Sequence, residues 1–254
     1  MPRLMGNDDT MQQGQIGGSG FSFSGTRIDH LTATSYTLVT IVIDASGSVT
    51  PFAQQLRDML KMAVLACKKS PRSDNILVRV LTFNSGFYQT RGIDEIHGFK
   101  PLADIDPDSY APIHPTGGTP LFDATYSAIG ATVAYGKQLT DLDYTVNAIN
   151  FIITDGADTG GAATPAMIKA EVEKVIVGEQ LESMINVLIG INVAQASAFL
   201  DRFRTEADLT NFIDAGDATP EKLAKIGEFI SQSISSQSVH LGTGGPSQQI
   251  AAVI

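Results

Sequence analysis

The chain has 254 residues, of which 43% are hydrophobic, 17 are lysine or arginine and 27 are aspartate or glutamate. This apolar content suffices for a full core and excludes wholesale disorder. The net charge of −10 argues against nucleic acid or an anionic membrane as the main partner. No apolar run approaches the roughly 20 residues that span a bilayer, and the polar stretch Met1–Gly20 has no secretory signal. We therefore expect a cytoplasmic protein that binds neither nucleic acid nor membrane.

Composition divides the chain into three segments. Residues 1–30 combine glycines with glutamines and serines, which predicts a flexible lead-in. Residues 31–237 alternate apolar and polar segments without a linker, which predicts one domain. Residues 238–254 are again rich in glycine and predict a flexible tail.

Five apolar runs predict the strands of a mostly parallel sheet. They are nearly continuous, as expected of strands that are covered on both faces. The runs are residues 36–43, 75–83, 147–154, 184–191 and 211–213. The more polar residues 87–90, followed by 93–97, predict a hairpin or an edge strand. Because helical segments separate the main strands, the pattern predicts a doubly wound α/β fold with helices on both faces.

The helical segments have apolar residues three or four positions apart and share a start signal. Thr50, Thr119, Thr164 and Thr219 each precede a proline. A threonine hydroxyl can accept a hydrogen bond from an unpaired amide, and proline loses nothing at the first helical position. The single cysteine, Cys67, lies on the apolar face of the first helix, so we expect a buried thiol and no intramolecular disulfide.

Oxygen-bearing side chains follow the predicted strands. Asp44 comes directly after the first apolar run, with Ser46 and Ser48 at alternate positions behind it; Asp155 follows a later run, and Thr119 lies in a Gly-Gly-Thr-Pro loop. Carboxylate and hydroxyl oxygens without a thiol or imidazole suit a hard cation such as Mg²⁺. Doubly wound sheets bind ligands beyond the carboxyl ends of their strands, where the strand order reverses. We therefore expect these motifs to meet at one divalent-metal site.

Simpler interpretations exist for the same residues. The two serines are also typical helix caps, and Thr119 stands before a proline like the other three threonines. Thr116 is an alternative hydroxyl in the same loop, but the two glycines before Thr119 allow the close backbone approach that a site needs. Asp158 is expected to cap a turn, and Asp123 to place a favourable charge near a helix N-terminus.

The sequence contains no recognisable catalytic machinery. It has no phosphate-binding loop, no dinucleotide-binding glycine motif and no nucleophile elbow. The four histidines are scattered, and neither histidine nor lysine stands beside Ser46 or Ser48 to activate a hydroxyl. We therefore predict that the protein is not an enzyme.

Together, the Asp-x-Ser-x-Ser motif at Asp44, the loop at Thr119 and the Asp-Gly pair at Asp155 resemble the metal-ion-dependent adhesion site of von Willebrand factor type A domains. The resemblance covers order, approximate spacing and position at strand ends, and it extends from Tyr36 to Ser236. It implies a Rossmann-like, six-stranded, mostly parallel sheet with a short antiparallel edge strand.

The resemblance also implies a ligand set and a partner. Ser46, Ser48 and Thr119 would coordinate Mg²⁺, or alternatively Mn²⁺ or Ca²⁺, through hydroxyl oxygens, while Asp44 and Asp155 would act directly or through water. An Asp or Glu of a partner protein would fill the open coordination position. Intracellular members of the family act as adaptors in multi-protein assemblies, including AAA+ ATPase and kinase–phosphatase systems. The alternatives are a metal-assisted phosphoester hydrolase, a structural or virion component with an unused metal site, and a surface adhesin.

Overall fold

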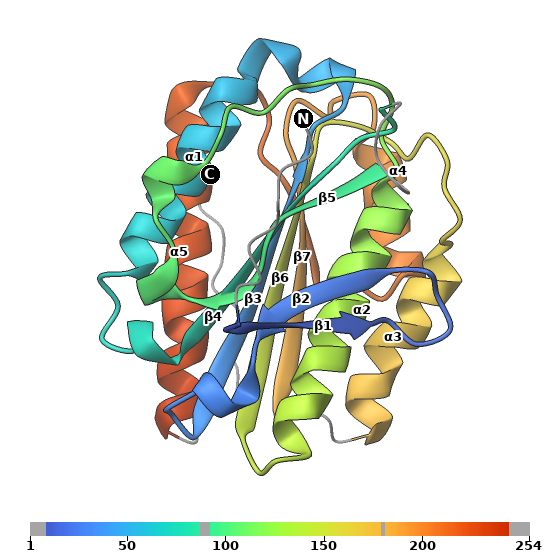
Figure 1. Cartoon of the computed structure of the whole chain (residues 1–254). Coiled ribbons are helices and arrows are strands. Elements are labelled where there is room, and N and C mark those ends of the chain that lie inside the picture. Colours follow the sequence, from blue (N-terminus) through green and yellow to red (C-terminus); the bar gives the residue numbers. More distant parts are fainter. Residues whose placement is uncertain (1–8, 87–91, 179–180, 244–254) are drawn as a thin grey trace.

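The computed structural model describes residues 9–86, 92–178 and 181–243 and consists of a sheet between two layers of helices (Figure 1). Its eight strands have the order β1-β2-β5-β4-β3-β6-β7-β8. The strands are β1 (Met11–Gln15), β2 (Ser22–Thr26), β3 (Ser35–Asp44), β4 (Ile76–Phe83), β5 (Ile93–Pro101), β6 (Thr145–Thr154), β7 (Ser183–Gly190) and β8 (Asn211–Asp214). The helices are α1 (Ala53–Cys67), α2 (Leu121–Thr140), α3 (Pro165–Gly178), α4 (Ser197–Glu206) and α5 (Pro220–Thr243).

The two faces of the sheet carry separate apolar cores. Helices α1 and α5 cover one face, and α2, α3 and α4 cover the other (Figure 1). On β3, Ile41 and Ile43 belong to the first core, whereas Leu38 and Val42 belong to the second. Because successive side chains of a strand point to opposite faces, a strand buried on both sides needs a continuous apolar run.

The predicted doubly wound α/β fold is confirmed. The five expected strands are β3, β4, β6, β7 and β8, and neighbouring members of the order β4-β3-β6-β7-β8 pair in parallel. The predicted edge strand is β5, which pairs antiparallel with β4. The stretch 87–90, predicted as part of that hairpin, lies outside the described residues.

The N-terminal segment differs from the prediction of a flexible lead-in and adds two strands to the expected six. Strands β1 and β2 form an antiparallel hairpin, and β2 joins β5 in parallel at Gly25 and Phe99. Phe23 is 1% exposed and packs edge-on against Phe99 at a centroid distance of 6.4 Å. The tyrosine hydroxyl of Tyr135 on α2 donates to the carbonyl of Thr26 at 2.5 Å. A few well-placed aromatic side chains thus dock a segment whose overall composition is typical of a linker.

A buried ion pair also holds the hairpin. The guanidinium of Arg79, on β4, is 1% exposed and its Nε lies 2.6 Å from Glu95 Oε2. The other oxygen of Glu95 accepts hydrogen bonds from both the amide and the hydroxyl of Ser24, on β2. One carboxylate therefore neutralises a buried cation and binds the added strand.

The C-terminal end also differs from the prediction, because α5 continues to Thr243 although a flexible tail was expected from residue 238. Gln237 and Ser238 are 1% and 0% exposed, and Asn147 on β6 donates to the carbonyl of Gln237 at 2.9 Å. Polar side chains buried against the sheet gave no apolar pattern from which to extend the helix. Residues 244–254 lie outside the described residues.

Candidate metal centre

The strands place Asp44 and Asp155 at the same edge of the sheet. β3 and β6 pair in parallel with Ile43 opposite Ile153; Asp44 follows Ile43 directly and Asp155 comes two residues after Ile153, so both lie at the rim. β4 lies on the other side of β3, and the strand order therefore reverses between β3 and β6. This is the switch point at which the sequence predicted a ligand site.

A chain of hydrogen bonds joins four of the five predicted metal ligands. The amide of Ser46 donates to Asp44 Oδ1 at 2.8 Å. The hydroxyl oxygens of Ser46 and Ser48 lie 3.0 Å apart, and that of Ser48 donates to Asp155 Oδ1 at 2.8 Å. A 3₁₀ turn over Gly47–Phe52 follows β3 directly and directs the serines toward the rim. Residues from two loops thus form one polar cluster.

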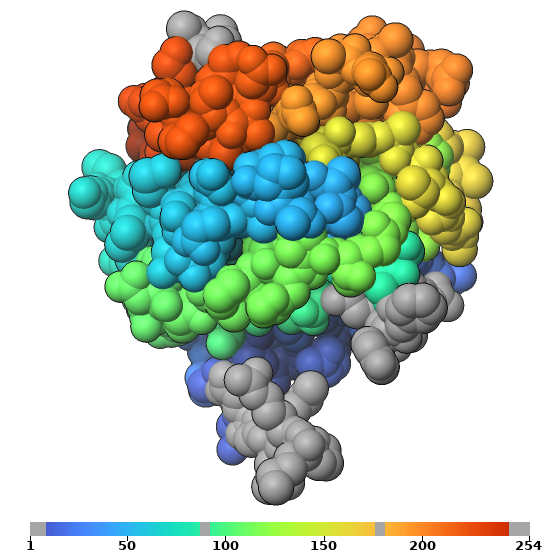
Figure 2. All heavy atoms as spheres, turned by 90° about the horizontal axis from the view of Figure 1, so that it is seen from above, coloured from blue at the N-terminus to red at the C-terminus, as the bar shows by residue number. Residues whose placement is uncertain are grey.

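The loop that carries Thr119 is fastened to the same turn. The amide of Thr116 donates to the carbonyl of Ala45, and the amide of Gly47 to that of Gly117, each at 3.0 Å. Gly117 has φ +67°, and a Cβ there would come within 2.8 Å of the backbone of Ser85. This position therefore needs glycine. Figure 2, a view from above, shows the turn after β3 (blue), the stretch before α2 (green) and the stretch after β6 (yellow) on one face.

The hydroxyl of Thr119 does not cap the helix that follows it. Thr119 is 5% exposed, and its hydroxyl has no hydrogen-bond partner within the described ranges. The first turn of α2 is capped from another loop, because the amide of Phe122 donates to Asp158 Oδ1 at 3.0 Å. A hydroxyl that is not used in capping is available to a ligand. Thr116, the alternative, is exposed.

The four Thr-Pro pairs divide into two groups. Thr164 and Thr219 each accept a hydrogen bond of 3.3 Å from the amide three residues on, as the capping prediction requires. The prediction is wrong for Thr50, whose hydroxyl donates to a backbone carbonyl inside the 3₁₀ turn, and for Thr119. Both exceptions lie in the loops that build the rim.

Burial disfavours the negative charge of this cluster. Asp44 is 1% exposed, and desolvation raises its pKa to about 6 despite hydrogen bonds from Ser46 and Thr154. Burial also raises the pKa of Asp155 above its ordinary value, although Ser48 donates to it. Throughout the described part of the chain, no lysine, arginine or histidine forms an ion pair with either carboxylate. Buried carboxylates without a counter-charge are a common feature of functional sites.

The donor set fits a small hard cation. Within residues 9–86, 92–178 and 181–243, no group of three or more His, Cys, Asp or Glu side chains could hold a metal, so a site here depends on hydroxyls. The oxygen pairs Ser46–Ser48 and Ser48–Asp155 are 3.0 and 2.8 Å apart. Adjacent ligands of octahedral Mg²⁺, with Mg–O bonds of about 2.1 Å, are about 3.0 Å apart. The oxygens thus already have nearly the spacing that such an ion requires.

Three supporting residues escaped the sequence analysis. Thr154 Oγ1 donates to Asp44 Oδ2 at 2.7 Å, and Thr159 Oγ1 accepts from the amide of Thr119 at 2.7 Å. Asp123 was expected only to favour a helix N-terminus, but its Oδ1 accepts from the amides of residues 162 and 163. Thr154 and Thr159 directly adjoin Asp155 and Asp158, which is the one signal that could have identified them; the role of Asp123 depends on a loop about 40 residues away.

The cluster offers little for acid–base chemistry. The hydroxyls of Ser46 and Ser48 are bonded to each other and to Asp155, and no histidine or lysine of the described residues is hydrogen-bonded to either. No activation of either serine was predicted, and Asp155, the carboxylate that accepts from Ser48, is itself a predicted metal ligand. The arrangement suits ion binding.

No model of a known protein family matches the sequence, and no curated protein matches it. Solved structures do. The PilB minor pilin of Streptococcus sanguinis is 14% identical over 88% of this chain and 66% of its own, with a TM-score of 0.57. The pilus adhesin SpaC of Lactobacillus rhamnosus GG is 12% identical over 85% and 31%, with a TM-score of 0.53. Proximal thread matrix protein 1 from the mussel byssus is 20% identical over 80% and 47%, with a TM-score of 0.50.

These likenesses concern the fold. The chain spans 46% to 66% of the length of the first structures that it matches. Among the described residues, no helix combines the length and apolar character of a membrane span. The chain therefore has an α/β fold that it shares with the solved structures of a minor pilin, a pilus adhesin and a byssus thread protein.

Proposed function

We propose that this chain is a von Willebrand factor type A domain that binds a protein partner through a divalent cation. Asp44, Ser46, Ser48, Thr119 and Asp155 would hold the ion, with Mg²⁺ as the first choice and Mn²⁺ or Ca²⁺ as alternatives. The observation that carries the proposal is the buried, uncompensated Asp44, joined by hydrogen bonds through two serines to Asp155.

The charge of the site favours an acidic partner. When bound, the cation would supply a Lewis-acidic position to an incoming oxygen ligand. Asp44 and Asp155 are the only carboxylates in the proposed set, so they would leave no excess negative charge to repel a third. An Asp or Glu of a partner protein is the side chain that such a position would take.

The protein would then act as a non-catalytic adaptor within an intracellular assembly. This part of the proposal rests on family analogy, which points to AAA+ ATPase or kinase–phosphatase systems. A metal-assisted hydrolase is less well supported, because it needs a positioned base or a cationic clamp beside the ion. Ser48 donates to the carboxylate of Asp155, which the proposal uses as a metal ligand, and no cationic side chain among the described residues is hydrogen-bonded to either serine.

A role at the cell surface is a second candidate. The observation in its favour is the shared fold with a minor pilin and a pilus adhesin. Fractionation of the producing cells separates the two: recovery in the cytoplasm supports the adaptor, and recovery in the surface fraction supports the adhesin.

Thermal unfolding of the metal-stripped protein tests the ion. We expect millimolar Mg²⁺ to raise the unfolding midpoint, because a ligand that binds only the folded state stabilises it. Ser46→Ala and Ser48→Ala should lose this rise, whereas Ser73→Ala, far from the site, should keep it. Partner capture by immobilised protein should follow the same pattern and disappear in EDTA. The proposal is contradicted if the unfolding midpoint does not change with Mg²⁺, or if Mg²⁺ still raises the midpoint of the Ser46→Ala protein.

A further inference from the structure

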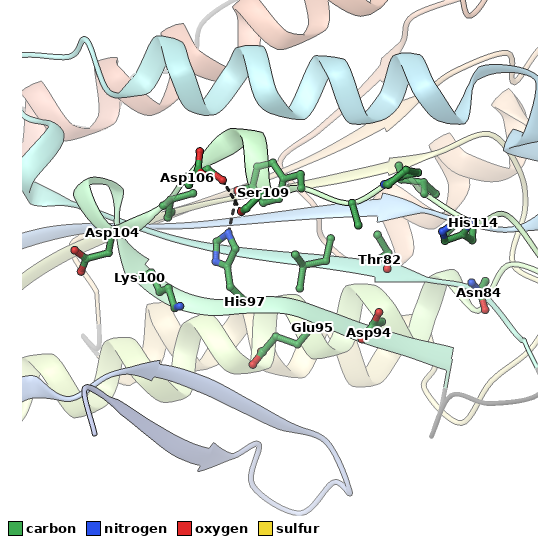
Figure 3. A pocket seen from close by; sticks show the side chains of 17 residues that line it. Thr82, Asn84, Asp94, Glu95, His97, Lys100, Asp104, Asp106, Ser109 and His114 are labelled. Carbon is green, nitrogen blue, oxygen red and sulfur yellow. Dashed lines mark hydrogen bonds between the residues drawn. The ribbon is translucent and has the colours of Figure 1, made fainter. Parts of the chain in front are cut away.

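A cavity of about 600 Å³ lies beside the proposed metal centre (Figure 3). β4 and β5 form its floor, and the segment from Asp104 to His114 forms its opposite wall. Ala45, which lies between the proposed ligands Asp44 and Ser46, also lines the cavity. The cavity is therefore continuous with the rim of the sheet.

The floor of the cavity presents a hydroxyl that the described part of the protein does not use in its own hydrogen bonds. Thr82, on β4, is 9% exposed, and its hydroxyl has no hydrogen-bond partner in the described part of the chain. Asp94, on β5, is its cross-strand neighbour and is exposed. Directly opposite residues of an antiparallel pair lie on the same face with their Cβ atoms about 5 Å apart. A hydroxyl and a carboxylate thus lie side by side, open to a ligand.

The charge of the lining is negative. Among the described residues that line it, the carboxylates are Asp94, Glu95, Asp104 and Asp106, and the only lysine is Lys100. Glu95 is engaged with Arg79 and Ser24, and Figure 3 shows it on the far side of β5 from the cavity. Three carboxylates against one ammonium group therefore remain. This imbalance favours a cation over an anion or a neutral group.

A neutral aromatic pair and aliphatic side chains form the rest of the lining. His97 Nε2 lies 3.0 Å from the hydroxyl of Tyr110, and the two rings are stacked with centroids 5.9 Å apart. Burial lowers the pKa of His97, so its ring adds no positive charge at neutral pH. Ile96, 42% exposed, and Ile113 also line the cavity. Such walls suit the aliphatic stem of a long basic side chain.

The strand spacing relates the cavity to the metal centre. Asp44 is opposite Phe83, and Thr82 is opposite Asp94, so the Cα atoms of Asp44 and Asp94 lie two strands apart at nearly the same height, although their side chains leave opposite faces of the sheet. Two inter-strand spacings of about 4.8 Å give about 10 Å. An extended peptide covers that distance in about three residues.

We infer that this cavity is a subsite for a lysine or arginine of the same partner segment whose Asp or Glu would reach the metal. The basic residue would lie about three positions from the acidic one in an extended stretch. The evidence for the subsite is the cavity, the negative charge of its lining and the hydroxyl of Thr82. The predicted spacing between the basic and the acidic residue depends in addition on the proposed function.

NMR titration of the full chain in EDTA tests the subsite without the metal. The probes are Nα-acetyl-lysine methylamide and its neutral analogue Nα-acetyl-norleucine methylamide. The lysine probe should shift the amide signals of Thr82 and Ile96, and Asp94→Asn should raise its Kd about two- to fivefold, the range of an exposed charge pair. The matched control is Asp74→Asn, an exposed aspartate before the opposite end of β4. The inference is overturned if both probes shift these amide signals equally, or if Asp94→Asn and Asp74→Asn weaken binding of the lysine probe equally.

The spacing is tested with the peptide acetyl-Gly-Asp-Gly-Gly-Lys-Gly-amide and its norleucine counterpart. In Mg²⁺ the lysine peptide should bind more tightly than the norleucine peptide and more tightly than in EDTA. If the lysine preference persists in EDTA but Mg²⁺ adds nothing, the subsite stands and the metal proposal falls. If Mg²⁺ increases the affinity for both peptides equally and the lysine peptide has no advantage, the metal proposal is supported and the subsite is contradicted.

Discussion

The hydroxyl of Ser48 donates a 2.8 Å hydrogen bond to Asp155, a residue 107 positions later in the chain. This hydrogen bond links the loop after β3 to the loop after β6, and the strand order reverses between these two strands. Ser48 is bonded in turn to Ser46, whose amide holds the buried carboxylate of Asp44.

Asp44→Asn should stabilise the metal-free protein while removing its response to Mg²⁺. Desolvation raises the pKa of Asp44 to about 6. At pH 7.5 the native state thus holds a charge that burial disfavours, at a cost on the order of 3 kcal/mol. An asparagine can still accept from the Ser46 amide, while Thr154 Oγ1 can donate to the carbonyl of Gly156. Urea denaturation in EDTA measures the gain, with Asp74→Asn as the neutral control.

The same carboxylate predicts a pH dependence. Its folded-state pKa of about 6 exceeds the ordinary value of 3.8, so the native state binds this proton more tightly than the unfolded state. The free energy of unfolding should therefore rise as pH falls from 7 toward 4.5, relative to Asp44→Asn. The difference between wild type and variant isolates Asp44, because His97 and the other groups titrate in both. A difference that is constant over this range would contradict the assignment.

Asp158→Ala should loosen the loop that carries Thr119. Asp158 Oδ1 accepts from the amide of Phe122 and Oδ2 from that of Gly160, so it caps α2 from the loop after β6. Loss of a helix cap costs about 1 kcal/mol, measurable by urea denaturation. Because this cap links two loops of the rim, the rise in the unfolding midpoint caused by Mg²⁺ should also shrink. Asp141→Ala, at the other end of α2, should leave that rise unchanged.

Glu95→Ala should destabilise the protein by about 3–5 kcal/mol, because it leaves the buried Arg79 without a counter-charge. Ser24→Ala should cost only about 1 kcal/mol, since it removes the hydroxyl but not the amide contact. The two losses should not add in the double variant, because both residues act through one carboxylate. Urea denaturation gives all three values. Glu173→Ala, half of an exposed ion pair on α3, is the control and should change stability by less than about 0.5 kcal/mol.

The thiol of Cys67 should be inert in the native protein. Cys67 is 1% exposed, and burial raises its pKa to about 12, so the reactive thiolate is scarce at pH 8. Reaction with a chromogenic disulfide reagent should be slow in buffer and rapid in guanidinium chloride. Rapid reaction in buffer would show that the C-terminal end of α1 opens readily.

The strands and the position of the site were predictable because both depend on local patterns. A continuous apolar run that ends in an aspartate identifies a buried strand and its rim, which is how Asp44 and Asp155 could be placed together. The N-terminal hairpin and the support of the site depend instead on tertiary contacts. Phe23 docks the N-terminal hairpin through Phe99 and Tyr135, and neither partner is near it in sequence. The role of Asp158 depends in the same way on the first turn of α2, 36 residues away.

The N-terminal hairpin has a further consequence for solubility. Without it, β5 would be the outermost strand, and its unpaired amides and carbonyls together with Ile96 would invite pairing with other molecules. The hairpin replaces that border with β1, a five-residue strand whose sequence is MQQGQ. A short polar border of this kind is a poor template for intermolecular β-structure, so the segment that resembles a linker protects the sheet from aggregation.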